Sequence, residues 1–237
     1  MRLSVRRAVV LTALFLLVAA LTTGVRQWHE RAAADSVGAL CQRFTDQQQA
    51  RAAADSGTGP GVLVIGDSWS SGFALPQPER SWPARLPGRV HVDGFPGSGF
   101  SAGASNCVGV AYFERAARDL RTDPAVVVVE GGLNDYDQTS AAIAAGFHRL
   151  MARLHGEHVV VVGPAMAPSR AGQVPRVDRL LASLCEQADV PYLSTVSLRL
   201  SYVADRLHPD QAGTDAFGDA VATFVRPRLG PLDATLD

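Results

Sequence analysis

Two short polar motifs near opposite ends of the chain supply the residue types needed for nucleophilic catalysis. Residues 66–68 read Gly-Asp-Ser directly after the apolar run 62–65, which places the Ser68 hydroxyl at a predicted turn from a strand into a helix. Asp205 and His208 are three residues apart, a spacing at which the carboxylate can reach the imidazole. The carboxylate would fix the imidazole tautomer, and the other ring nitrogen would take the serine proton. We therefore predict Ser68 as nucleophile, His208 as base and Asp205 as the acid that orients it.

Two further motifs can supply hydrogen-bond donors to the oxyanion that such a reaction forms. Closely spaced glycines in residues 93–103 allow the backbone to approach a ligand with its N–H groups free. Gly97 is the preferred donor in this segment, and Gly99 is the alternative because one sequence does not fix the loop register. Asn134 follows another apolar run and offers a side-chain N–H, while the backbone N–H of Ser68 is the remaining predicted donor.

Each motif has an ordinary structural explanation when it stands alone. Ser68 can cap a helix, and Asn134 can form an Asx-turn. Asp205 can cap the following helix beside a solvated histidine. The occurrence of all four motifs in one chain, rather than any single one, favours catalysis.

The elements that must position these motifs are predicted by the apolar pattern. Two runs, residues 126–129 and 159–162, are continuous Val, as expected for strands buried on both faces of a parallel sheet. The predicted fold class is therefore α/β, in which sites form beyond the carboxyl ends of the strands. The expected strands are at 62–65, 90–92, 126–129, 159–162 and 192–193, and the expected helices at 111–121, 140–155, 175–188 and 209–225.

The four motifs, in this order, resemble the sequence blocks of the SGNH/GDSL hydrolase superfamily. The resemblance covers about residues 62–224 and includes Gly-Asp-Ser, a glycine block, Gly-Leu-Asn-Asp and Asp-Arg-Leu-His. It implies a three-layer α/β/α, flavodoxin-like fold with a parallel sheet of about five strands. The residues that it assigns to the site are the nucleophile Ser68, the acid and base Asp205 and His208, and the oxyanion donors Ser68, Asn134 and Gly97 or Gly99.

The resemblance also has two departures. Trp69 stands where the family often has a smaller residue or Tyr, and the glycine block begins with Asp93 where Asn is usual. Neither change removes a catalytic group, but both leave open the shape of the pocket and the identity of the glycine donor.

The function that these observations predict is an exported serine hydrolase. It would cleave carboxylic esters, with short acyl or O-acetyl groups on a carbohydrate, a lipid or another small molecule. One alternative is a cell-envelope O-acetyltransferase that uses the same triad. A second alternative is a non-catalytic extracellular binding module, which the presence of every expected catalytic residue type disfavours.

Composition excludes several other classes of partner. Lys and Arg number 22 against 23 Asp and Glu, so the net charge of −1 gives no field that would attract nucleic acid. The three cysteines form no CxxC motif and no cluster with histidine at metal-ligand spacing, so no metal site is expected. No organic cofactor is implied.

The amino terminus predicts export. Arg2, Arg6 and Arg7 precede an apolar run at residues 8–21, which indicates a signal peptide or signal anchor over residues 1–25. The domain that follows is expected to be extracellular or in the cell envelope, attached to the membrane if the segment is not cleaved. Residues 26–60 are expected to be a helical or flexible spacer, and 61–230 the catalytic domain.

Cysteine pairing and oligomeric state are left open by the sequence. In an exported chain a disulfide between Cys107 and Cys185 is one expectation. Cys41, in the spacer, would be free if that disulfide forms. The alternative is that Cys41 pairs with either Cys107 or Cys185.

Overall fold

The computed structural model describes residues 22, 26, 35–120 and 123–229. The predicted signal segment, residues 1–25, lies outside the described residues except for Thr22. None of the described helices is both long and apolar enough to span a bilayer. The chain divides into two compact units, Met1–Gln42 and Arg43–Asp237, and the second contains all four motifs. In the first unit, residues 35–42 are helical.

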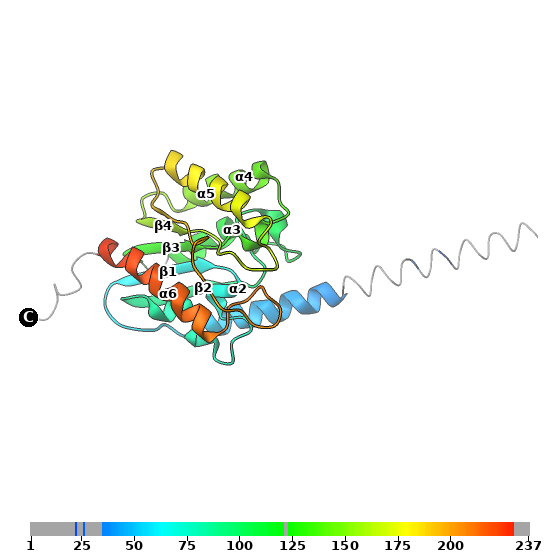
Figure 1. The fold of residues 1–237 in the computed structure, drawn as a ribbon, viewed down its shortest axis with the longest axis horizontal. Coiled ribbons are helices and arrows are strands. Elements are labelled where there is room, and N and C mark those ends of the chain that lie inside the picture. Colours follow the sequence, from blue (N-terminus) through cyan, green and yellow to red (C-terminus); the bar gives the residue numbers. More distant parts are fainter. Residues whose placement is uncertain (1–21, 23–25, 27–34, 121–122, 230–237) are drawn as a thin grey trace, which may run out of the picture. The chain divides into compact units, whose positions relative to one another are not determined.

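The second unit is built around a parallel sheet with the strand order β2-β1-β3-β4-β5 (Figure 1). On β1, the strand next to the edge strand β2, Val62 pairs with Val90 on one side and with Val126 on the other. The sheet confirms the predicted α/β class and the five predicted strands. Their bounds are β1 (Gly61–Gly66), β2 (Arg89–Gly94), β3 (Val126–Glu130), β4 (Val159–Val162) and β5 (Tyr192–Leu193).

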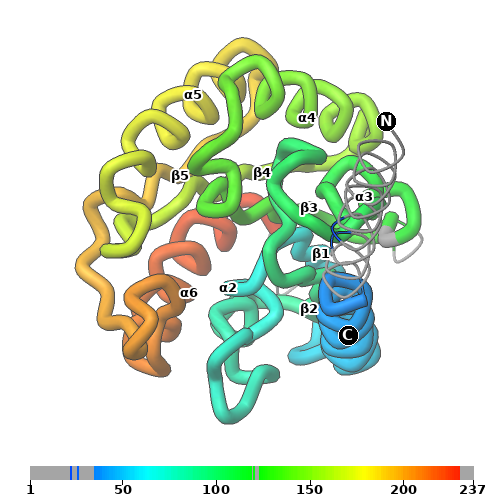
Figure 2. Tube along the Cα trace, turned by 90° about the vertical axis from the view of Figure 1, so that its right-hand side faces the viewer, coloured from blue at the N-terminus to red at the C-terminus, as the bar shows by residue number. Residues whose placement is uncertain are grey.

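Helices cover both faces of the sheet because successive strand residues point to opposite sides. Val62 and Val64 belong to the apolar cluster beneath α6, whereas Leu63 and Ile65 belong to the cluster beneath α3, α4 and α5. Figure 2 shows α4 and α5 along one side of the strands and α6 on the other. This is the expected three-layer arrangement. The helices are α3 (Tyr112–Asp119), α4 (Ser140–Arg153), α5 (Val174–Gln187) and α6 (Gln211–Val225).

Helix ends differ from the predicted ones by a few residues, and the start of α6 shows why. The sequence predicts a helix from Pro209, but α6 begins at Gln211 because Asp210 is its N-cap. The Asp210 carboxylate accepts a hydrogen bond from the N–H of Gly213 at 2.8 Å, which satisfies a donor of the first turn. Pro209 therefore lies just outside the helix.

Part of the predicted spacer packs on the edge of the sheet. Within the helical stretch 43–52, Phe44 makes edge-on contacts with Phe73 and Phe95, and Gln48 donates a hydrogen bond to Asp93. Ser56 then exchanges two backbone hydrogen bonds with Val90 of β2. These contacts protect the open edge of β2, which would otherwise present unpaired backbone groups. The domain boundaries given above stay predictions.

The cysteines give one correction. Cys185 is a buried free thiol on α5, and Cys107 is disulfide-bonded. The expected Cys107–Cys185 disulfide is therefore wrong. Cys185 instead packs in the apolar cluster between α5 and the sheet, as free cysteines commonly do.

A glycine on the buried face of α4 tests this packing. An added Cβ at Gly146 would overlap the carbonyl of Phe100, so Gly146→Ala is expected to lower the free energy of unfolding by about 1–3 kcal/mol. Gly38 lies in helical residues too but has nothing within 4 Å of an added Cβ. Gly38→Ala is expected to leave the free energy unchanged or to raise it by up to about 1 kcal/mol. Urea unfolding of both variants is the measurement, and equal effects would contradict the packing.

Candidate active site

Ser68 is the first residue of the short helix α2 (Ser68–Ser71), which follows β1 after one turn residue. Gly66 makes this abrupt change of direction possible, because a Cβ there would overlap the Ser70 side chain. Asp67 caps the helix by accepting the N–H of Trp69 at 2.9 Å. The turn therefore holds Ser68 at the carboxyl end of β1.

The structure brings Ser68, Asp205 and His208 together. The Oγ of Ser68 lies 3.0 Å from Nε2 of His208, a contact between residues 140 positions apart. The other ring nitrogen, Nδ1, lies 2.6 Å from Oδ2 of Asp205. Oδ1 of Asp205 accepts the N–H groups of Leu207 and His208 at 2.8 and 2.9 Å, so both carboxylate oxygens are held. This is the geometry of a nucleophile, a base and an orienting acid.

Local electrostatics keep the Asp205 carboxylate ionised. Burial raises its pKa, but the hydrogen bonds from the His208 ring and from the two N–H groups lower the pKa by more. The net result is a pKa below the usual value for Asp. An ionised carboxylate at this point supports the positive charge that the imidazole gains when it accepts a proton. His208 itself is buried and packs against Phe73, with the ring centroids 4.9 Å apart.

The two candidate glycine donors have different surroundings. Gly97 has a φ of 82°, and an added Cβ there would meet only Oγ of Ser105, at 3.8 Å. At Gly99 a Cβ would lie 2.5 Å from the Asp135 carboxylate, so this glycine is packed into the protein. Among the described residues no hydrogen bond uses the N–H of Gly97. The N–H of Gly99 is likewise unused among the described residues, so the choice between the two donors stays a prediction, although only Gly97 has space where a Cβ would be.

Asn134 connects the loops of the site. It lies in the 3-10 helix η5 (Leu133–Asp135) after β3, and its Nδ2 donates to Oδ2 of Asp67 at 3.1 Å and to the carbonyl of Ser98 at 2.9 Å. The amide thus ties the nucleophile turn to the glycine loop, a structural role that the sequence did not reveal. To hold an oxyanion, Asn134 must exchange one of these two bonds for the bond to the substrate. Its predicted role as a donor stays a prediction.

Three buried carboxyl groups lie beneath the site. Burial raises the pKa of Asp67 to about 7 and the pKa of Asp135 to about 6. Burial, followed by the nearby charge of Asp67, also raises the pKa of Glu130 well above its usual range. Glu130 accepts a hydrogen bond from Ser70 Oγ at 2.6 Å. Because Asp67 and Glu130 each disfavour the charge of the other, they are not both fully ionised at neutral pH.

Arg115 of α3 holds the ends of two strands in place. Its guanidinium donates to the carbonyls of Gly66 and Asp93 at 2.9 and 2.8 Å and forms an ion pair with the Asp93 carboxylate at 2.6 Å. The side chain is almost fully buried. The sequence analysis missed both Arg115 and Glu130. The sequence indicates a role only for Glu130. A charged residue directly after a buried run of Val is itself expected to be buried, and it then needs hydrogen-bond partners.

The site contains no candidate metal centre. Within residues 35–120 and 123–229, no three His, Cys, Asp or Glu side chains cluster so that they could hold a metal ion. The polar groups that face Ser68 are an imidazole, a carboxylate, an amide and backbone N–H groups. This set is suited to proton transfer and to stabilising an oxyanion.

Comparison with sequence-family models identifies the family of this chain. The sequence model of the GDSL-like lipase/acylhydrolase family matches residues 64–216, which include all the predicted site residues. No curated protein matches the sequence significantly.

Solved structures share the fold at low sequence identity. An inhibitor-bound aryl esterase from M. smegmatis aligns with a TM-score of 0.64 and 17% identity, over 71% of this chain and 99% of that chain. A carbohydrate acetylesterase family member from Sinorhizobium meliloti aligns with a TM-score of 0.59 and 22% identity, over 72% and 99%. A putative arylesterase from Agrobacterium tumefaciens gives 0.57 and 22%, over 71% and 99%.

The raised carboxyl pKa values predict how stability depends on pH. Between the unfolded pKa, about 4, and a folded pKa of about 7, the folded protein holds a proton on Asp67 that the unfolded chain has lost. The free energy of unfolding is therefore expected to fall as pH rises from 5 to 8, with at most about 1.4 kcal/mol per pH unit from this group. Asp67→Asn should make the slope shallower. Urea unfolding at several pH values measures it, and an unchanged slope would contradict the assignment.

Proposed function

This chain belongs to the GDSL-like lipase/acylhydrolase family and is an ester hydrolase, and we propose that Ser68, His208 and Asp205 are its catalytic triad. The observation that carries the proposal is the continuous hydrogen-bonded series from Ser68 Oγ through the His208 ring to Asp205, with distances of 3.0 and 2.6 Å. A serine in this arrangement can lose its proton as it attacks a carbonyl carbon.

The proposed reaction has two halves. In the first, Ser68 Oγ bonds to the ester carbonyl carbon and its proton moves to Nε2 of His208. His208 then gives this proton to the leaving alcohol, which leaves an acyl group on Ser68. In the second half, a water molecule attacks the acyl carbon and gives a proton to His208. That proton returns to Ser68 as the carboxylic acid departs.

The oxyanion formed in each half needs fixed donors. The N–H of Ser68 lies at the start of α2, where helical N–H groups have no intrahelical acceptor. We assign the second donor to the N–H of Gly97, where an added Cβ would meet only Oγ of Ser105, and the third to the side-chain amide of Asn134. Preorganised donors of this kind are worth about 3–4 kcal/mol of transition-state stabilisation each.

The proposed substrates are esters with a short acyl or O-acetyl group on a carbohydrate or lipid alcohol. The Sinorhizobium meliloti structure, which is named as a carbohydrate acetylesterase family member, supports an acetyl group by analogy of fold, and the aryl esterase from M. smegmatis supports ester hydrolysis. We propose that the domain acts outside the cytoplasm, because the basic residues and the apolar run of the amino terminus are typical of an export signal.

Substitution of the triad tests the proposal. Ser68→Ala and His208→Ala are expected to reduce hydrolysis of p-nitrophenyl acetate to background, and Asp205→Asn to reduce kcat by about 10²–10⁴-fold. His91 offers a matched control, because it also contacts a carboxylate, Asp55 at 2.9 Å, but lies within β2 rather than beyond the carboxyl end of a strand. His91→Ala should retain wild-type activity. Full activity of Ser68→Ala would rule out the proposed nucleophile.

The dual role of Asn134 predicts a second kinetic result. Asn134→Ala removes a proposed oxyanion donor and two structural bonds, so kcat should fall by about 10²–10³-fold while KM changes little. The thermal midpoint should also fall, since Asp67 and Ser98 each lose a partner. Steady-state kinetics and thermal unfolding measure the two effects separately. A lower thermal midpoint with an unchanged kcat would show that Asn134 is purely structural.

A further inference from the structure

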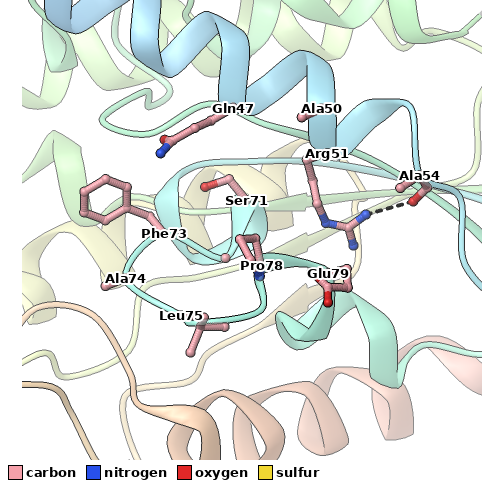
Figure 3. A pocket seen from close by; sticks show the side chains of 11 residues that line it. Gln47, Ala50, Arg51, Ala54, Ser71, Phe73, Ala74, Leu75, Pro78 and Glu79 are labelled. Carbon is pink, nitrogen blue, oxygen red and sulfur yellow. Dashed lines mark hydrogen bonds between the residues drawn. The ribbon is translucent and has the colours of Figure 1, made fainter.

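A cavity of about 320 Å³ lies beside the proposed site (Figure 3). One wall is the helical stretch 43–52, and the other is the segment from Ser71 to Glu79. Phe73 lines this cavity and also packs against the His208 ring, so one aromatic side chain contacts both the cavity and the triad. Much of the remaining lining is apolar and includes Ala50, Leu75 and Pro78.

Arg51 is the unusual residue of this cavity. The residue is only 4% exposed, and its Nη1 donates to the carbonyl of Ala54 at 3.0 Å. Its Nε and Nη2 are buried and have no hydrogen-bond partner among the described residues. These two nitrogens form one edge of the guanidinium, the edge that binds a carboxylate through two parallel hydrogen bonds.

Nearby carboxylates do not neutralise Arg51. Burial lowers its pKa, while the charges of Glu79 and Asp55 act in the opposite direction. Asp55 is already bound to Arg89 at 3.2 Å and to His91 at 2.9 Å. Glu79 is exposed at the rim of the cavity, and within the described part of the chain neither carboxylate forms an ion pair with Arg51. The buried charge thus lacks a counterion of its own.

An unpaired buried donor is costly, at about 1–3 kcal/mol for each group and more for a charged one. A ligand that supplies two acceptor oxygens would remove this cost. We propose that the cavity is a subsite for a carboxylate carried by the ester substrate, with Arg51 as its partner. This inference rests on the proposed function, because the carboxylate is placed on the far side of Phe73 from an ester at Ser68. Because Nε and Nη2 of Arg51 are buried, a carboxylate can reach them only if the residues that cover them move aside.

The kinetic test compares anionic and neutral esters of the same length. The substrates are mono-p-nitrophenyl succinate, glutarate and adipate, each against its neutral methyl ester. In wild type, the ratio of kcat/KM for the anionic ester to that for the neutral ester should be highest at one chain length. Arg51→Met should lower this ratio at least about tenfold, the loss expected for a charge-assisted hydrogen bond. Arg51→Lys should give an intermediate ratio, because Lys keeps the charge but not the fork.

Arg80 supplies the matched control. It is an exposed arginine next to Glu79 and does not line the cavity. Arg80→Met removes the same charge and should leave the ratio unchanged. A ratio that is equal in wild type and Arg51→Met at every chain length would overturn the proposal, and so would an equal drop in Arg80→Met.

A binding measurement separates this inference from the proposed function. One of the three dicarboxylates succinate, glutarate and adipate should raise the thermal midpoint of Ser68→Ala but not of the Ser68→Ala, Arg51→Met double variant. If wild type cleaves no ester faster than Ser68→Ala, the proposed function is refuted. The binding measurement still shows whether the cavity binds a carboxylate through Arg51. Inorganic phosphate is the probe for a free anion as the ligand. If phosphate raises the thermal midpoint only when Arg51 is present, and the anionic-to-neutral ratio of kcat/KM does not depend on Arg51, the cavity binds a free anion and the substrate assignment is overturned.

Glu79→Gln tests the remaining internal explanation. If the cavity binds a carboxylate, removal of a like charge at its rim should raise the anionic-to-neutral ratio. If Glu79 is instead the counterion of Arg51, Glu79→Gln and Arg51→Met should each destabilise the protein, and the double variant should be no less stable than either single one. That non-additivity would overturn the proposal.

Discussion

The abrupt turn from β1 into α2 is the constraint on which the rest of the site depends. Gly66 allows the helix to fold onto the end of the strand, Asp67 caps it, and Arg115 binds the Gly66 carbonyl from α3. Because β1 is flanked by β2 and β3, the loops that follow all three strands begin beside this turn. The change in strand order between β1 and β3 is where open parallel sheets bind ligands. The residues of the site are thus positioned relative to the turn between β1 and α2.

Carboxyl groups in this domain fall into two kinds. Asp67, Glu130 and Asp135 are buried, their pKa values are raised, and their hydrogen bonds hold loops together. Asp205 is 43% exposed, its pKa is lowered, and it faces the His208 ring. The degree of burial therefore distinguishes the two kinds. The buried carboxyl groups hold the loops of the site together, and the more exposed Asp205 carboxylate can support a protonated imidazole. The same principle makes Arg51 notable, since it is a buried charge without such partners.

Val runs predicted the fold, and the three-residue spacing predicted the contact between Asp205 and His208. The contact of His208 with Ser68, 140 positions away, was expected only from the family resemblance. Gly97 was already the preferred donor from the sequence, but the packing of Asp135 against Gly99, which sets the two glycines apart, was not predictable. The bonds of Asn134 and the cavity at Arg51 also arise from contacts between distant segments. The Cys107–Cys185 pair was predicted wrongly for the same reason, because the sequence does not show which residues lie next to a cysteine in space.

The central claim is that His208 activates Ser68, and covalent labelling with a fluorophosphonate tests it most directly. The reagent needs an activated serine and no particular ester, so it is independent of the substrate. Peptide mass spectrometry should find the label on Ser68 in wild type and in His91→Ala, and no label at that residue in His208→Ala. Labelling of Ser68 at the same rate in His208→Ala, or of another serine in wild type, would contradict the account.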